Sequence, residues 1–343
     1  MKNPVAPLSF LPCHTVTMSP PHLVTQSCRA MATFFEVALW GREPEYLETV
    51  AEEALREVQR LEQQLSFYRS DSDIRELNVR AADEPVYVEP RLFAVLERAK
   101  RLSEETGGAF DITVAPLIRA WGFQGDSGRI ASDDDLAAAR EQVGMDLVEL
   151  NSENYSVRFA KPGVTIDLGA IGKGYAVEQA AEIIRDAEIP GALIHGGTST
   201  VQAVGTQSDG TPWAVAIQDP TDSENRLAVV SLSDSALSVS AVHGKYFTEG
   251  EVRYGHVLDP RTGRPVMNAL LAAVVCQSAT DSDALSTALL VGGEQVIDAL
   301  VPGRPDLKAL LVVPSESGEF RLIAHGIEMN RASKGIDVGE LRP

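Results

Sequence analysis

The stretch VTIDLGAIGKGYAVE, residues 164–178, separates two parts of the chain that differ in their hydrophobic patterns. It predicts a short strand, a glycine-spaced loop and a helix, an arrangement that often binds phosphate groups. The glycines do not follow the dinucleotide spacing, and Lys173 precedes Gly174 where a P-loop carries Ser or Thr. A tight turn with Lys173 in solvent would produce the same pattern, so the residues alone leave the ligand of this loop open.

Helical patterns dominate the part of the chain before this stretch. A strand-like alternation over 32–41 is followed by apolar residues at helical spacing over 45–66. A second helix is expected over 90–106, where a proline begins the pattern and two glycines end it. A shorter helix over 135–144 and a hairpin over 146–159 complete this part.

Strand-like runs dominate the part after it. They cover residues 191–197, 213–219, 227–233, 236–241, 270–278, 307–314 and 319–326. A helix that starts near Asp283 and another over 294–301 interrupt them. Because helices gather early and strands late, we expect an α+β fold with mixed sheets and helices, and not a doubly wound parallel sheet.

The domain organisation follows from the absence of internal repeats and of a linker rich in Pro or Ser. Residues 31–330 are expected to form one compact unit, with 331–343 as a C-terminal tail. Residues 1–30 contain a poor apolar run broken by prolines, which predicts a disordered leader or a degenerate signal segment outside the fold.

The charge balance limits the ligands that the protein can bind. Lys and Arg number 30 against 49 Asp and Glu, which gives a net charge of −19. This argues against broad binding to nucleic acid or anionic membranes, and no apolar run is long enough for a transmembrane segment. A phosphate site would therefore need a local Lys or Arg, or a metal cation. The three cysteines show no paired spacing, which indicates neither a disulfide framework nor a structural zinc site.

Two segments combine polar groups with turn or apolar residues. In TGGAFDITVAPLIRAWGF (106–123), Asp111 stands in an apolar run and needs a partner, so that a capping role and a functional role remain equally open. In RYGHVLDPRTGRPV (253–266), a strong turn signal is flanked by His256 and Arg261, which suit proton transfer and phosphate binding. A single histidine is more often structural, but the polar residues around it favour function.

Asp283 and Thr287 are four residues apart near the start of the predicted helix, so their side chains point from one face. A carboxylate and a hydroxyl are oxygen ligands that suit Mg²⁺. Alternatively, Asp283 is a first-turn acid favoured by the helix dipole and Thr287 an ordinary helix residue. In either case Asp281 could cap the helix.

Six segments in this order resemble the FAD:protein FMN transferase (ApbE) family, from about residue 31 to about residue 300. They are MATFFEVAL, LSFYRSDSDIRELN, GGAFDITVAPLIRAWGF, IDLGAIGKGYAV, HVLDPRTGRPV and SDALSTALLVGG. The resemblance implies an ApbE/T-fold-like structure with FAD in a cleft, and a Mg²⁺-dependent transferase. Such an enzyme cleaves the FAD pyrophosphate, attaches FMN through a phosphoester to a Thr or Ser of an acceptor flavoprotein, and releases AMP.

The resemblance also implies roles for particular residues. The metal would be held by the side chains of Asp283 and Thr287 and by the carbonyl of Ala170, and His256 would be the base that activates the acceptor hydroxyl. The implied FAD contacts are Met31, Tyr68, Ala109, Phe110, Asp111, Asp167, Lys173 and Val257. Three places depart from the family pattern. Thr198 stands where an acid is expected, and Ala32 where Gly is common. In SVSAVHGKYF, residues 241–243 come between the serine and the aromatic residue, where the family has SG.

Two further activities remain open at this point: a Mg²⁺-dependent FAD pyrophosphatase that releases FMN and AMP, and a non-catalytic flavin-binding or delivery protein. The compartment is also open. The N-terminus supports export poorly and favours the cytoplasm, whereas relatives of the family often act in the periplasm or anchored to a membrane.

Overall fold

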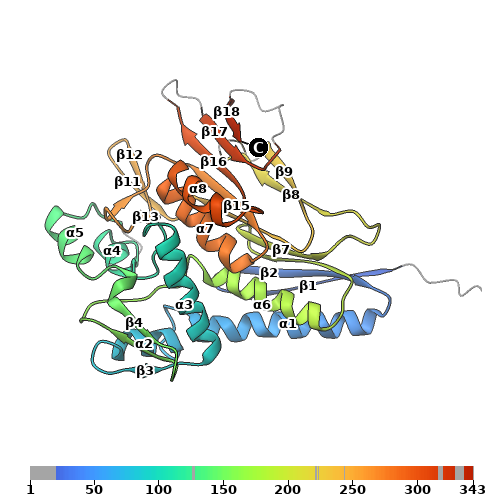
Figure 1. Ribbon diagram of the computed structural model, residues 1–343, viewed down its shortest axis with the longest axis horizontal. Helices are drawn as coiled ribbons and strands as arrows, with labels where there is room; N and C mark the ends of the chain where they lie inside the picture. The colour runs from blue at the N-terminus through green and yellow to red at the C-terminus, as the bar shows by residue number, and fades with distance from the viewer. Residues whose placement is uncertain are drawn as a thin grey trace, which may run out of the picture.

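The structure is a computed structural model centred on a nine-stranded sheet (Figure 1). It describes residues 21–125, 128–220, 222, 224–242, 244–315, 320–328 and the backbone of 336–342. The strands of the sheet, in spatial order, are β1 (His22–Ala30), β2 (Thr33–Gly41), β6 (Gly191–Gly196), β7 (Thr200–Gly205), β10 (Ala236–Ala241), β15 (Leu271–Cys276), β16 (Lys308–Pro314), β17 (Phe320–His325) and β18 (Ile336–Arg342). Neighbouring strands are antiparallel except for the parallel pair of β17 and β18.

Smaller sheets and the helices surround this sheet. The smaller sheets are β3 (Val86–Tyr87) with β5 (Ser156–Phe159) and β4 (Val148–Asn151), β8 (Trp213–Gln218) with β9 (Arg226–Leu232), β11 (Tyr246–Glu249) with β12 (Val252–Gly255), and β13 (Leu258–Asp259) with β14 (Arg264–Pro265). The α-helices are α1 (Pro44–Leu65), α2 (Asp73–Arg80), α3 (Pro90–Glu105), α4 (Ala115–Ala120), α5 (Asp133–Arg140), α6 (Gly172–Asp186), α7 (Ala279–Gly292) and α8 (Glu294–Leu300).

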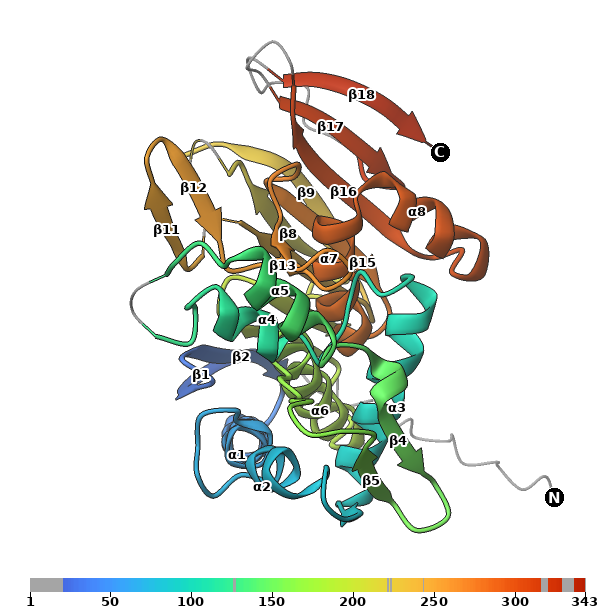
Figure 2. The same ribbon diagram turned by 90° about the vertical axis from the view of Figure 1, so that its left-hand side faces the viewer.

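Three helices cover one face of the sheet. The helix α1 packs on β1 and β2, α6 on β6 and β7, and α7 on β10 and β15. The three lie side by side in the order α1, α6, α7 (Figures 1 and 2). The hairpin of β8 and β9 covers part of the other face, where apolar side chains of β7, β10, β15, β16 and β17 form a second core. The predicted α+β class with mixed sheets is therefore confirmed.

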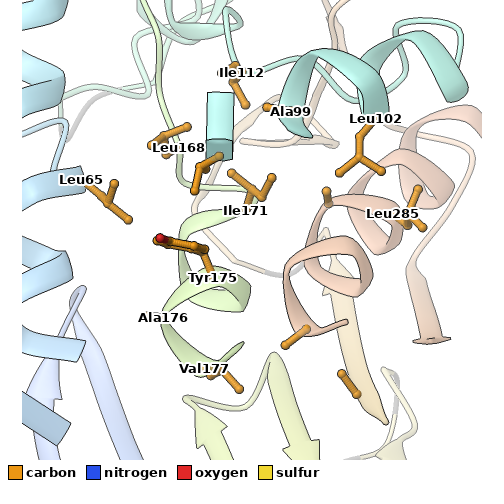
Figure 3. Packing of buried hydrophobic residues seen from close by; sticks show 14 of the residues in the cluster. Leu65, Ala99, Leu102, Ile112, Leu168, Ile171, Tyr175, Ala176, Val177 and Leu285 are labelled. Carbon is orange, nitrogen blue, oxygen red and sulfur yellow. The ribbon is translucent and has the colours of Figure 1, made fainter. Parts of the chain in front are cut away.

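The start of α6 lies at the centre of the main core. Figure 3 shows Ile171 and Tyr175 of this segment between Leu65 of α1, Leu102 of α3 and Leu285 of α7. All five side chains are buried. The beginning of α6 is thereby fixed against three other helices, which gives it a defined position for a binding site.

The folded unit extends beyond the predicted limits. Residues 22–30, predicted to lie in the leader, form β1, and Met31 and Ala32 make a two-residue hairpin turn to β2 with φ of 49° and 60°. Most β1 side chains are exposed or half-buried, so the strand lacks the apolar alternation that would have revealed it. Residues 1–20 lie outside the described residues. In the predicted tail, 336–342 form β18, while 331–335 and 343 lie outside the described residues.

Two further expectations about local structure were wrong. Residues 164–168 form no strand with any part of the chain that the structure describes. Instead, the Asn78 side chain accepts from the Ile166 N–H and donates to the Ile166 carbonyl, both at 2.8 Å. One amide side chain thus replaces a strand neighbour. The helix α7 begins at Ala279 and not near Asp283. Its cap is Ser278, whose hydroxyl accepts from the N–H of Asp281 at 3.0 Å, so Asp281 is not the cap.

Candidate active site

The predicted metal-binding carboxylate lies where α6 and α7 meet. Asp283 is 4% exposed, and its Oδ2 accepts a hydrogen bond from the backbone N–H of Gly174 at 2.8 Å. Its Oδ1 accepts from the hydroxyl of Thr200 on β7 at 3.4 Å. A Cβ atom at position 174 would lie 2.2 Å from the carbonyl oxygen of Ala279, so glycine is required for this approach. The glycine pattern of the sequence therefore serves helix contact as well as the turn, because Gly172 and Gly174 belong to α6 itself.

The oxygen atoms around this junction suit a hard cation. Asp283 is buried without an ion-pair partner among the described residues, and a buried carboxylate requires a compensating charge. Thr287 lies one turn further along α7, with its Oγ1 3.4 Å from the Asp283 carbonyl oxygen. No hydrogen bond between described residues ends on the Ala170 carbonyl, because the N–H of Gly174 is directed at Asp283. A carboxylate, a hydroxyl and a carbonyl are the ligand types of Mg²⁺.

This donor set contains a single carboxylate. In agreement, the described residues contain no cluster of three or more His, Cys, Asp or Glu side chains that could hold a metal. A cation here would keep several coordination positions for water or phosphate oxygens, as Mg²⁺ usually does.

An ionic cluster that the sequence did not predict lies at the beginning of α7, next to the junction of α6 and α7. Arg98 of α3 donates to Asp281 at 2.6 Å, to Glu178 of α6 at 2.7 Å, and to the Ser278 hydroxyl. Arg304 donates to the other oxygen of Asp281 at 2.7 Å. Burial acts to raise the pKa of Asp281, but Arg98 and Arg304 outweigh it and hold the pKa below its usual value. This cluster ties α3, α6 and α7 together.

Lys173 and Asp167 flank the same junction. The Nζ of Lys173 lies 3.4 Å from the carbonyl oxygen of Gly169, and Oδ1 of Asp167 accepts from the N–H of Gly169 at 2.8 Å. Burial raises the pKa of Asp167, although this hydrogen bond and the charge of Lys173 lower it in part. Partial desolvation and the charge of Asp167 raise the pKa of Tyr68, whose side chain is otherwise exposed. Lys173 and Asp167 therefore both contact Gly169, and Tyr68 lies close enough to Asp167 to be affected by its charge.

His256 follows β12 and is oriented by Lys245. The carbonyl oxygen of Lys245 accepts from the backbone N–H of His256 at 2.9 Å and lies 3.1 Å from its Nδ1. Burial lowers the pKa of His256, and the charges of Lys173 and Lys245 lower it further against the effect of the carbonyl. The imidazole is thus neutral near pH 7, with the Nδ1 proton directed at the carbonyl and Nε2 able to accept a proton.

Asp111, another predicted FAD contact, is hydrogen-bonded to groups of the protein itself. Asp111 accepts from the Thr113 N–H at 2.7 Å, from the Thr113 hydroxyl at 2.5 Å and from the Met145 N–H at 3.2 Å. Burial raises its pKa. The structural role left open for Asp111 is therefore present. It also lines a hollow of about 650 Å³ together with Gly107, Gly108 and Arg261.

Four further predicted FAD contacts, together with Arg261, complete the account of the predicted site. Ala109 and Phe110 are each 1% exposed, so a ligand can meet little more than their backbone. The N–H of Met31, in the β1–β2 turn, donates to Glu62 of α1 at 2.7 Å. Val257 packs against the main core, and its carbonyl accepts from the Val266 N–H at 3.0 Å. Arg261 forms an ion pair with Asp259 of its own turn at 2.8 Å.

The comparisons with known proteins show the family of the chain. The model of the ApbE family matches residues 31–311, and the chain therefore belongs to this family. The chain is 30% identical over 275 residues to an FAD:protein FMN transferase of Vibrio cholerae, covering 79% of this chain and 81% of that protein.

Solved structures agree with the family assignment. The crystal structure of the ApbE protein of Thermotoga maritima superposes with a TM-score of 0.78 at 28% identity, covering 87% of this chain and 96% of that one. The apo form of the Pseudomonas stutzeri flavinyl transferase ApbE gives the same TM-score and identity, with coverage of 89% and 95%. Within the described part of the chain, no helix has the length and hydropathy needed to cross a membrane.

Proposed function

We propose that the protein is a Mg²⁺-dependent FAD:protein FMN transferase. It cleaves the pyrophosphate of FAD, joins FMN through a phosphoester to a Thr or Ser hydroxyl of an acceptor protein, and releases AMP. The observation that carries this proposal is the buried Asp283, which has no ion-pair partner among the described residues and is held against the start of α6 by Gly174, beside Lys173. The activity named for the Vibrio cholerae relative supports the same reaction.

The cation would be held by Asp283, Thr287 and the carbonyl oxygen of Ala170. When bound, Mg²⁺ offsets the negative charge on the pyrophosphate oxygens as the bond to AMP breaks. Lys173 supplies a second positive charge on the same side, which an acidic protein needs in order to bind an anionic dinucleotide. The proposed FAD contacts further include Tyr68 and Asp167, with Met31, Ala109, Phe110, Asp111 and Val257 as the remaining predicted positions.

His256 is the proposed base. Its Nε2 accepts the proton of the acceptor hydroxyl, whose oxygen forms the new bond to the FMN phosphorus while AMP departs with the bridging oxygen. The carbonyl of Lys245 holds the Nδ1 proton and so fixes the tautomer and the orientation of the ring. The lowered pKa keeps the ring in the neutral form that this role requires.

The test is to incubate the protein with FAD and Mg²⁺, with and without a candidate acceptor protein. The expected result is AMP release together with a mass increase of one FMN on the acceptor. If FMN is found only in solution, the activity is that of a pyrophosphatase and not of a transferase. FAD binding without AMP release would indicate a binding protein. An acceptor whose Thr or Ser is replaced by Val or Ala serves as the control, because it cannot receive FMN.

A further inference from the structure

Two neighbouring strands present hydroxyl groups to the helix that carries the proposed metal ligands. Thr200 of β7 and Ser238 of β10 are paired across the sheet, and Ser240 is the next residue on the same face of β10. Thr200 is 2% exposed, Ser238 is fully buried and Ser240 is partly buried. Buried hydroxyls on a strand are unfavourable unless they are hydrogen-bonded, so their partners show what they do.

The first set of contacts ends at Thr287. The hydroxyl oxygens of Ser240 and Thr287 lie 3.1 Å apart, and those of Ser240 and Ser286 lie 2.8 Å apart. Ser286 donates to the Asp283 carbonyl oxygen at 2.9 Å, so its own proton is already used. Each hydroxyl has one proton, so Ser240 donates to Ser286. Thr287 then donates to Ser240 at 3.1 Å in preference to the Asp283 carbonyl oxygen, which lies further away at 3.4 Å. This directs the Thr287 proton toward β10 and leaves its lone pairs for a cation.

The second set ends at the Asp283 carboxylate. Ser282 and Ser238 have their hydroxyl oxygens 2.7 Å apart, Ser238 donates to Thr200 at 3.2 Å, and Thr200 donates to Oδ1 of Asp283 at 3.4 Å. The N–H of Gly174 holds Oδ2 at 2.8 Å. Both carboxylate oxygens are therefore held, one from α6 and one from β7, and the carboxylate cannot rotate freely.

We propose that Thr200 and Ser240 are positioning residues that orient Asp283 and Thr287 for Mg²⁺ and thereby set the affinity for the metal. The proposal rests on the proposed function, because it assumes that these two residues hold the cation. Groups that hydrogen-bond to metal ligands commonly change metal affinity by 10–100-fold when they are removed. The effect arises because a ligand that must first be oriented binds the ion less tightly.

The central comparison is Thr200→Val against Thr200→Ser. Valine keeps the shape of threonine and removes the hydroxyl, whereas serine keeps the hydroxyl. Binding of Mn²⁺, which uses the same oxygen ligands, is measured from the loss of the free-ion EPR signal. Thr200→Val is expected to weaken binding about 10–100-fold, and Thr200→Ser less than about threefold. The Mg²⁺ concentration for half-maximal FAD cleavage should rise in the same order.

Ser240→Ala is the second variant, at a partly buried position where folding is less at risk, and it should also weaken Mn²⁺ binding. Ser231→Ala, at an exposed site on β9, is the matched control and should bind like the parent. Melting temperatures without metal show that each variant is folded. If Thr200→Val or Ser240→Ala binds Mn²⁺ as tightly as the parent, that residue has no positioning role.

Asp283→Ala separates this inference from the proposed function. Loss of Mn²⁺ binding in Asp283→Ala, together with parent-like binding in both hydroxyl variants, would leave the metal site in place and overturn the positioning role alone. Parent-like Mn²⁺ binding in Asp283→Ala would overturn the metal site itself, and the positioning role with it.

Discussion

Gly174 and Asp283 are 109 residues apart in the sequence, yet the backbone N–H of one meets the carboxylate of the other at 2.8 Å. The contact exists because position 174 has no side chain: a Cβ there would lie 2.6 Å from the Cβ of Asp283. The junction of α6 and α7 therefore combines a packing requirement with the orientation of a proposed metal ligand.

The first prediction is that Gly174→Ala disrupts this junction, whereas Gly172→Ala does not. The added methyl group at 174 would also overlap the Ala279 carbonyl, and such overpacking costs about 1–3 kcal/mol or more of unfolding free energy. At 172 the nearest atom is the Leu168 Cβ at 3.9 Å, an ordinary contact. Urea denaturation and FAD cleavage measure the two effects. Equal behaviour of the two variants would contradict the close approach of the helices.

The second prediction is that Ala32→Gly stabilises the protein. Ala32 adopts φ of 60°, a left-handed conformation that alanine enters at a cost of about 1 kcal/mol and glycine enters freely. The unfolding free energy should rise by up to about 1 kcal/mol. Ala138→Gly, at an exposed position within α5, is the opposite control and should lower it by about 0.5–1 kcal/mol. A decrease at both positions would argue against the hairpin turn between β1 and β2.

The third prediction is that Arg98→Met lowers the unfolding free energy by about 3–5 kcal/mol. The substitution removes the ion-pair partner of Glu178 and leaves Asp281 paired with Arg304 alone. Removing one partner of a buried ion pair carries this penalty because the other charge stays buried without compensation. Arg56→Met, which removes an exposed pair with Glu52, should change it by less than about 1 kcal/mol. Denaturant titration measures both, and a small effect at Arg98 would show that the cluster is not tightly coupled.

The fourth prediction concerns the pH dependence of FMN transfer. Burial and the charges of Lys173 and Lys245 lower the pKa of His256 below its ordinary 6.5, so the base is lost only when the pH falls through that lower value. The rate should therefore rise with pH to a plateau reached below neutrality. Lys245→Gln removes one of the charges and should move the acid limb to higher pH. Lys308→Gln, on β16, is the control with an unchanged limb.

A pH profile of kcat/KM measured from AMP release decides this point. An acid limb with an apparent pKa above 6.5 in the parent, or one that does not move in Lys245→Gln, would contradict the proposed environment of His256.

Strong periodic patterns made the large elements predictable. The helix expected over 45–66 is α1, Pro44–Leu65, because its apolar stripe determines both the helix and the face that it buries. The β8–β9 hairpin and the last strands follow in the same way. In contrast, the N-terminal turn of α7 carries Thr280, Asp281 and Ser282, which have the character of a loop although they are buried. Their burial depends on partners far away in the sequence.

The same distinction applies to the candidate site. The i, i+4 spacing of Asp283 and Thr287 and the glycines around Lys173 are local signals, and they were visible in the sequence. The pair of Arg98 and Asp281 spans 183 residues, and no local pattern could have joined them. The role of Asn78 beside Ile166 was hidden for the same reason, because a side chain there replaces an expected backbone partner.

The distance along the chain between the two halves of the α6–α7 junction has a consequence for protein synthesis. Gly174 and Asp283 are 109 residues apart. A ribosome adds about 5–20 residues per second, so Asp283 is added roughly 5–22 s after Gly174. During that interval the side of α6 that later packs on α7 has no partner within the nascent chain. The α6–α7 junction therefore cannot assemble before α7 has been synthesised, and premature termination before α7 yields a product that lacks the junction altogether.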